Sequence, residues 1–109
     1  MRIACLHLFA ALTLASCGGS SYGSCRKSSL TQQGLTVCVD YLGGNWSVDS
    51  AKADCTTAAG SYVSATCLPG SLGTCTFGGG NEVKWTFIAL PDGGTAANIC
   101  QENQGIFNP

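Results

Sequence analysis

The stretch "AKADCTTAAGSY", residues 51–62, has a counterpart in "AANICQENQGIF", residues 96–107. In both, an alanine lies four residues before the cysteine, a glycine lies five residues after it, and an aromatic residue lies seven after it. "GSC" at 23–25 stands ahead of the first stretch, and "GTC" at 73–75 stands ahead of the second. These matches predict an internal repeat with units over about 23–62 and 73–107.

Each of the two stretches predicts a short helix. Ser47 and Asp92 stand eight residues before the helix cysteines, and both are good N-cap residues. Gly60 and Gly105 stand where a helix commonly ends on a left-handed residue. The buried faces are expected to be Val48, Ala51, Cys55, Ala58 and Ala59 in the first helix and Ala96, Ile99, Cys100 and Asn103 in the second. Because the second face is less apolar, we expect the second helix to depend more on its disulfide.

Ahead of each helix the sequence predicts a β-hairpin. "LTVCVDYLGGNW" (35–46) and "EVKWTFIALP" (82–91) alternate and are rich in β-branched and aromatic residues, which is typical of strands. "TQQG" (31–34) and "FGGGN" (77–81) are suited to the turns before them. The expected fold is therefore α+β: a small disulfide-stapled domain, 25–109, made of two β-hairpin-plus-helix repeats. Residues 63–72 would connect the repeats through a Pro-Gly turn.

The cysteines predict three disulfides. Two of the eight, Cys5 and Cys17, lie near the N-terminus, and the other six are Cys25, Cys38, Cys55, Cys67, Cys75 and Cys100. An even number in a small exported chain is typical of a disulfide framework, although six cysteines allow 15 pairings. The repeat favours Cys25–Cys55 and Cys75–Cys100, which leaves Cys38–Cys67. The main alternative pairs Cys25 with Cys38 across a hairpin.

The N-terminal residues predict export. Arg2 precedes an apolar run too short to span a bilayer, and small residues close that run, as in a secretory signal peptide. Leu14-Ala15-Ser16-Cys17 resembles the lipobox of bacterial lipoproteins. The resemblance implies cleavage after a signal peptide of 1–16, a diacylglycerol thioether on Cys17 and acylation of its amino group. Several acyl chains bind a membrane far more tightly than one. Residues 17–24 would then be the lipidated cysteine and a flexible tether, and Gly18, by the sorting rule for such lipoproteins, favours the outer membrane.

Composition excludes several functions. Charged residues make up 10% of the chain, the formal net charge is −1, and no basic run is present to bind nucleic acid. There is no C-x-x-C pair, and the single histidine, His7, lies in the leader, so no metal or cofactor is expected. The six carboxylates are not spaced for paired acid–base work, and Asp49 and Asp92 suit helix starts. We therefore do not expect an enzyme.

Trp46 and Trp85 are the candidate binding residues, because a fully apolar pocket for each is hard to build in so small a domain. A protein or a carbohydrate is the partner class they would suit. Aromatic residues of this kind more often form the core, which is the competing interpretation.

The whole arrangement resembles small cysteine-rich bacterial lipoproteins that repeat G-[ST]-C, an aromatic-bearing strand and an alanine-rich helix ending C-x4-G-x-aromatic. That resemblance implies location and architecture, not chemistry. The expected function is a non-enzymatic structural or interaction module, lipid-anchored at the outer membrane or cell surface. The alternative is a disulfide-rich inhibitor or binding protein that presents a rigid loop, such as "CLPGSLGT" (67–74), to a hydrolase or a carbohydrate.

Overall fold

A computed structural model of the chain describes residues 21–29 and 32–109. The predicted signal peptide (1–16), Cys17 and residues 18–20 of the predicted tether lie outside the described residues.

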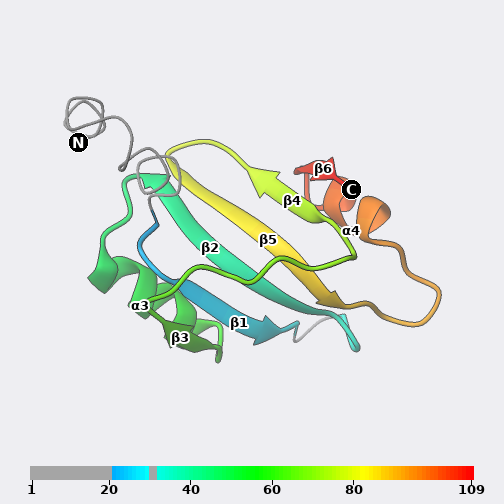
Figure 1. The fold of residues 1–109 in the computed structure, drawn as a ribbon, viewed down its shortest axis with the longest axis horizontal. Coiled ribbons are helices and arrows are strands. Elements are labelled where there is room, and N and C mark those ends of the chain that lie inside the picture. Colours follow the sequence, from blue (N-terminus) through cyan, green and yellow to red (C-terminus); the bar gives the residue numbers. More distant parts are fainter. Residues whose placement is uncertain (1–20, 30–31) are drawn as a thin grey trace.

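The domain is built on one antiparallel sheet of six strands (Figure 1). In chain order the strands are β1 (Ser24–Ser28), β2 (Thr36–Gly44), β3 (Ser61–Val63), β4 (Thr74–Phe77), β5 (Asn81–Ala89) and β6 (Ile106–Asn108). Their order across the sheet is β3-β1-β2-β5-β4-β6, so the two long strands β2 and β5 pair at its centre. Helix α3 (Val48–Thr57) lies between β2 and β3 in the chain, and α4 (Ala96–Glu102) lies between β5 and β6. The fold is thus a small α+β domain with more sheet than helix.

Alternation along the central strands gives the sheet one apolar face and one polar face. In β2, Val37, Val39 and Tyr41 are buried in the hydrophobic core. The intervening residues Cys38 and Asp40 point to the opposite face, because successive side chains of a strand alternate. The apolar face carries the helices, whereas the segment between β3 and β4 crosses the other face (Figure 1).

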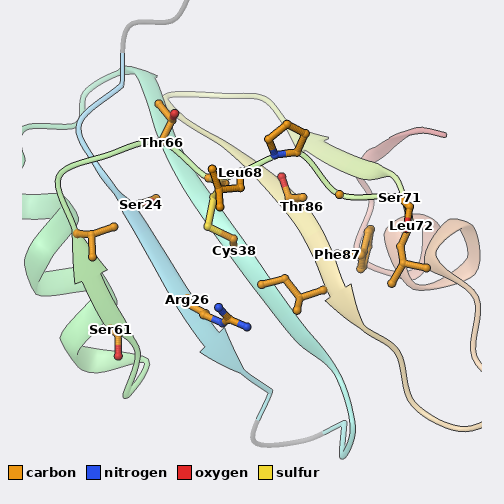
Figure 2. Close-up of a pocket in the computed structure, with 15 residues that line it drawn as sticks. Ser24, Arg26, Cys38, Ser61, Thr66, Leu68, Ser71, Leu72, Thr86 and Phe87 are labelled. Carbon is orange, nitrogen blue, oxygen red and sulfur yellow. A yellow bond between two sulfur atoms is a disulfide. The ribbon is translucent and has the colours of Figure 1, made fainter.

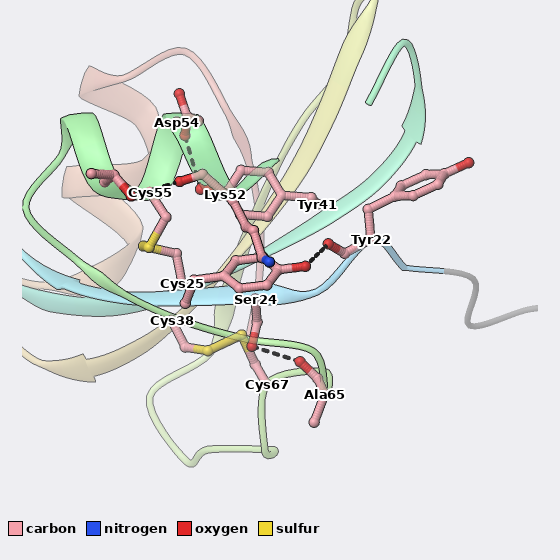
Figure 3. Close-up of a disulfide and its surroundings, with 12 residues drawn as sticks. Tyr22, Ser24, Cys25, Cys38, Tyr41, Lys52, Asp54, Cys55, Ala65 and Cys67 are labelled. Atoms are coloured by element: carbon pink, nitrogen blue, oxygen red, sulfur yellow. Dashed lines mark hydrogen bonds between the residues drawn. A yellow bond between two sulfur atoms is a disulfide. The ribbon is translucent and has the colours of Figure 1, made fainter. Parts of the chain in front are cut away.

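Three disulfides join cysteines of the described region: Cys25–Cys55, Cys38–Cys67 and Cys75–Cys100. These are the pairs that the repeat favours, and Cys25 is not joined to Cys38. The first links β1 to α3, and the third links β4 to α4. Cys38–Cys67 lies on the other side of the sheet, and Figure 3 shows it on the opposite side of β1 from Cys25–Cys55.

The first helix begins where the sequence predicts, but the second does not. Ser47 caps α3, its hydroxyl accepting a bond from the Ser50 N–H while the Ser50 hydroxyl accepts one from the Ser47 N–H. The N-cap of α4 is Thr95 rather than Asp92. The reason is the turn over 91–94, in which the Gly94 N–H donates to the Pro91 carbonyl and Gly93 adopts a φ of 76°. Because residues 91–94 form this turn, the helix is capped at Thr95.

Both helices end in the same way, one residue earlier than predicted. The left-handed residues are Ala59 (φ 59°) and Gln104 (φ 64°), not Gly60 and Gly105. In each case the glycine N–H donates to the carbonyl of the helix cysteine, Cys55 or Cys100, as in a Schellman motif. Glycine is required there for space: a Cβ on Gly60 would overlap Cys25 Sγ, and one on Gly105 would overlap Cys75 Sγ.

The buried helix faces also differ from those predicted. In α3, Val48 is 50% exposed and only Ala51 and Cys55 are buried. The shorter α4 buries Ala96, Ile99 and Cys100, while Asn103 is exposed. The expectation that the second helix has the weaker apolar contact with the sheet is therefore wrong, because Val48 is half exposed and Asn103 does not belong to the buried face, which leaves Ile99, buried as predicted, as the largest apolar contact of either helix.

The domain starts earlier than the predicted tether allows. The Tyr22 N–H donates to the Tyr41 carbonyl, and β1 already begins at Ser24. Gly23 is buried with a φ of 99°, and a Cβ there would overlap the Tyr62 ring. Tyr22, Gly23 and Ser24 thus belong to the folded domain and not to a flexible tether.

Candidate functional site

Residues 64–73, called the strap here, cross the polar face of the sheet between β3 and β4 (Figure 2). Three contacts hold its first half. The Ser24 hydroxyl donates to the Ala65 carbonyl (2.7 Å), the Cys67 N–H donates to Asp40 Oδ1 (2.9 Å), and Cys67 is joined to Cys38. Ser24 and Asp40 oppose each other on β1 and β2 and are 1% and 3% exposed. Two buried polar residues of this face, Ser24 and Asp40, therefore fix the strap.

A groove of about 620 Å³ lies between the strap and the sheet. This volume is within the range of natural small-molecule sites. Its polar lining comes from Ser24, Arg26, Ser61, Thr66, Ser71 and Thr86. Its apolar side chains come from Val63, Leu68, Pro69, Leu72 and Ile88, while Phe87, whose side chain is buried in the core, contributes its backbone, and Cys38 and Cys67 complete the lining.

Exposed apolar side chains gather around this groove. Within the described residues six large apolar side chains are exposed, and four of them line it: Val63, Leu68, Leu72 and Ile88. Leu68, beside the disulfide, is 82% exposed. Apolar side chains clustered at a concave surface are typical of binding sites, whereas scattered ones are ordinary. The groove is therefore the leading candidate site.

Arg26 is the one charged residue among those that line the groove. It projects from β1, opposite Cys38, and Figure 2 shows its side chain extending toward β2. The neighbouring residue Lys27 lies on the other face of the sheet and lines a second, smaller cleft. The groove thus combines apolar walls with a single positive charge.

The second cleft, about 250 Å³, contains Trp85. It lies between the C-terminal ends of the two helices and is lined by Ala58 and Asn103. Trp85 is half-buried, and its ring packs on Phe77 with the centroids 4.7 Å apart. A side chain of this kind is available at the surface yet held in place by the core.

Trp46 occupies a different place from Trp85. Its indole Nε1 donates to the Glu82 carbonyl (3.0 Å), and its ring packs edge-on against Tyr41 with the centroids 4.7 Å apart. It lines neither the groove nor the second cleft. The two tryptophans named from the sequence therefore do not share one binding surface.

Two further polar contacts fasten α3 and β3 to the sheet (Figure 3). The Tyr41 hydroxyl donates to Asp54 Oδ2 (2.9 Å), and the Tyr62 hydroxyl donates to the Tyr22 carbonyl (2.6 Å). Burial, and then the hydrogen bond to Asp54, raises the pKa of Tyr41 well above its ordinary value. Asp40 and Asp54 both act as acceptors for groups that hold the fold together.

Within the described part of the chain, no three His, Cys, Asp or Glu side chains gather as a metal ion would require. No helix in 21–29 or 32–109 is both long and apolar enough to cross a membrane.

No family model, curated protein or solved structure matches the chain. The groove and the cleft therefore receive no site residues from a known protein, and their chemistry follows from their own geometry.

Proposed function

We propose that the chain is a bacterial envelope lipoprotein, cleaved before Cys17 and anchored by lipid on that residue at the outer membrane or cell surface. The observation that carries this proposal is Leu14-Ala15-Ser16-Cys17 at the end of an apolar leader, followed by Gly-Gly-Ser-Ser. The three disulfides support it, because such bonds persist in exported proteins and are rare in reducing compartments.

The folded domain would act as a non-enzymatic interaction module. Two observations support this part of the proposal. Asp40 and Asp54 are occupied by hydrogen bonds to Cys67 and Tyr41, which leaves neither as a ready acid or base. The groove under the strap, with its exposed apolar rim, is the surface best suited to a partner.

The domain would have arisen by duplication of one unit. The order of strands across the sheet reads the same from both edges, because β3-β1-β2 corresponds to β6-β4-β5. Each unit joins its first strand to its helix by a disulfide and places a glycine against that bridge. This correspondence supports two repeats over about 23–62 and 73–107.

The second candidate function is that of a loop-presenting inhibitor or a carbohydrate binder. The exposure of Leu68 next to a disulfide favours loop presentation. Gly70 tells against it, because a Cβ at this position would lie 3.3 Å from the Phe87 carbonyl oxygen, so the strap runs close to the sheet here instead of protruding. Trp85 in the cleft between the helices is the feature that favours a carbohydrate.

Expression of the full chain in a Gram-negative host tests the anchor. We expect wild-type protein in the outer-membrane fraction, with an intact mass that begins at Cys17 and carries lipid. Cys17→Ser should lose both the lipid and the cleavage before residue 17. Cys5→Ala is the matched control, because it removes a leader cysteine outside the lipobox and should change neither. A wild-type protein without lipid, beginning at another residue, would refute the proposal.

A further inference from the structure

We infer that the groove beneath the strap binds a small amphiphilic anion, with its single aliphatic chain along the apolar wall and its carboxylate on Arg26. This inference rests on the proposed function only in treating the groove as the binding surface, and it adds the chemical class of the ligand. It does not depend on the lipid anchor.

The apolar wall comes from two separate segments. Leu68 and Leu72 come from the strap, whereas Val63 and Ile88 come from the sheet below it. All four are exposed, and all four line the same concave surface. An aliphatic chain lying between them would remove apolar area from water on both sides, which is the main driving force for such a ligand.

The head group follows from charge. Arg26 is the sole charged side chain in the lining, and no carboxylate shares the groove with it. Asp40 lies on the same sheet face, but it is 3% exposed and accepts the Cys67 N–H. Arg26 is exposed, so its guanidinium is accessible at the edge of the apolar wall, where it can bind a carboxylate through two parallel hydrogen bonds.

The size and the fixed wall of the groove favour a small ligand. A volume of about 620 Å³ suits a drug-sized molecule. The strap is pinned at Ala65 and Cys67, so this end of the groove is already formed before a ligand arrives. A preformed wall lowers the cost of binding.

Octanoate is the probe, titrated into the full chain as purified, in zwitterionic nanodiscs whether or not the chain carries lipid, with methyl NMR signals as the readout. We expect the signals of Leu68, Leu72 and Ile88 to shift with saturation. Octanol and octylammonium, which have the same chain without the negative charge, should bind at least about tenfold more weakly, the factor expected when a charge-assisted hydrogen bond is lost.

Two charge variants locate the head group. Arg26→Gln should weaken octanoate binding by about tenfold. Lys27→Gln is the matched control, because it removes the same charge one residue away on the opposite face, and it should leave the affinity within about twofold. Leu68→Ala should weaken all three ligands alike, because it changes the wall and not the head-group site.

Three outcomes would overturn the inference. One is the absence of shifts at these methyl groups, and another is equal binding of the three probes. The third is loss of the same methyl signals on nanodiscs before any probe is added, which would show that the patch contacts lipid directly. Each leaves the proposed anchor intact, because the mass and the location of the Cys17 variant are measured separately.

Discussion

The two helices are held to the same sheet by different means. Helix α3 has ten residues but buries only Ala51 and Cys55, whereas α4 has seven residues and buries Ala96, Ile99 and Cys100. The longer helix therefore has the smaller apolar contact. Each helix has a disulfide to the sheet, and α3 has in addition a capping box at Ser47 and the bond from Tyr41 to Asp54.

Corresponding positions in the two halves of the sheet show this difference in contacts directly. Cys25 pairs with Val39 across the sheet and Cys75 pairs with Trp85, so Tyr41 and Phe87, each two residues further on, correspond. The residues preceding the helix cysteines, Asp54 and Ile99, correspond as well. The first half thus has a hydrogen-bonded polar pair where the second half has two buried apolar side chains.

What the two halves share is the contact between a glycine and a disulfide. Gly60 lies against Cys25–Cys55, and Gly105 lies against Cys75–Cys100. Both halves therefore pack a disulfide against a glycine, whereas the side chains that attach the helix to the sheet differ between them. Substitutions of the apolar contacts, of the two glycines and of the Tyr41–Asp54 bond test this difference.

Among the single substitutions, the largest expected effect is that of Ile99→Ala. Removing most of a side chain that is 2% exposed should lower the free energy of unfolding by about 3 kcal/mol. Val48→Ala in α3 should cost about 0.5 kcal/mol or less, because Val48 is half exposed. Urea denaturation of both variants gives the comparison. Equal losses would mean that α3 is docked by apolar contact after all.

Substitution of the shared glycines comes next. Gly60→Ala and Gly105→Ala should each cost about 1–3 kcal/mol, because the added methyl group overlaps a disulfide sulfur and overpacks the core. Gly78→Ala, where a Cβ meets nothing within 4 Å, is the control and should be near neutral. The melting temperatures of the three variants test this prediction. A Gly60→Ala variant as stable as Gly78→Ala would show that the disulfide need not pack against the helix end.

Apart from the control variants, the smallest expected effect is that of Tyr41→Phe. Loss of the bond to Asp54 should cost about 1 kcal/mol at neutral pH. Because the pKa of Tyr41 is raised in the folded state, the hydroxyl contributes stability that is complete below the unfolded pKa of about 10 and is lost as pH rises above it.

The pH dependence sharpens this last prediction. The wild-type protein should lose stability between pH 9 and 11 more steeply than Tyr41→Phe, as followed by urea midpoints at each pH. Asp54→Asn keeps an acceptor but removes the charge, so its slope should fall between the two. Parallel curves for wild type and Tyr41→Phe would contradict the assignment of the pKa shift to this site.

Much of the sheet could be predicted because its signal is local. Alternation placed the central strands at 35–46 and 82–91, close to the observed Thr36–Gly44 and Asn81–Ala89. The edge strands β3 and β6 were missed, because three residues are too few to show a period of two. Spacing predicts a left-handed φ at Gly60 and Gly105, whereas the structure needs these glycines for their close approach to a disulfide. Spacing alone does not distinguish the two requirements.

The groove could not be predicted, because it depends on contacts between distant segments. It exists only where the strap returns across the polar face of the sheet. There Cys67 is bonded to Asp40 and Cys38, which lie 27 and 29 positions earlier in the chain. A buried aspartate in the middle of a strand was the available signal, since Asp40 needs a partner once it leaves water. The identity of that partner, a backbone N–H of the strap, is a property of the tertiary structure.

Hydrogen exchange on two disulfide variants tests most directly the claim that the halves are held differently. Cys25→Ala/Cys55→Ala and Cys75→Ala/Cys100→Ala remove bridges with separations of 30 and 25 residues, so each should lose about 3.5 kcal/mol from chain entropy. The local response should differ. In the first variant the amides of α3 should lose protection well before the sheet does, whereas in the second variant those of α4 should remain protected with the sheet, because Ile99 still docks the helix. Earlier loss of protection in α4 than in α3 would contradict the account.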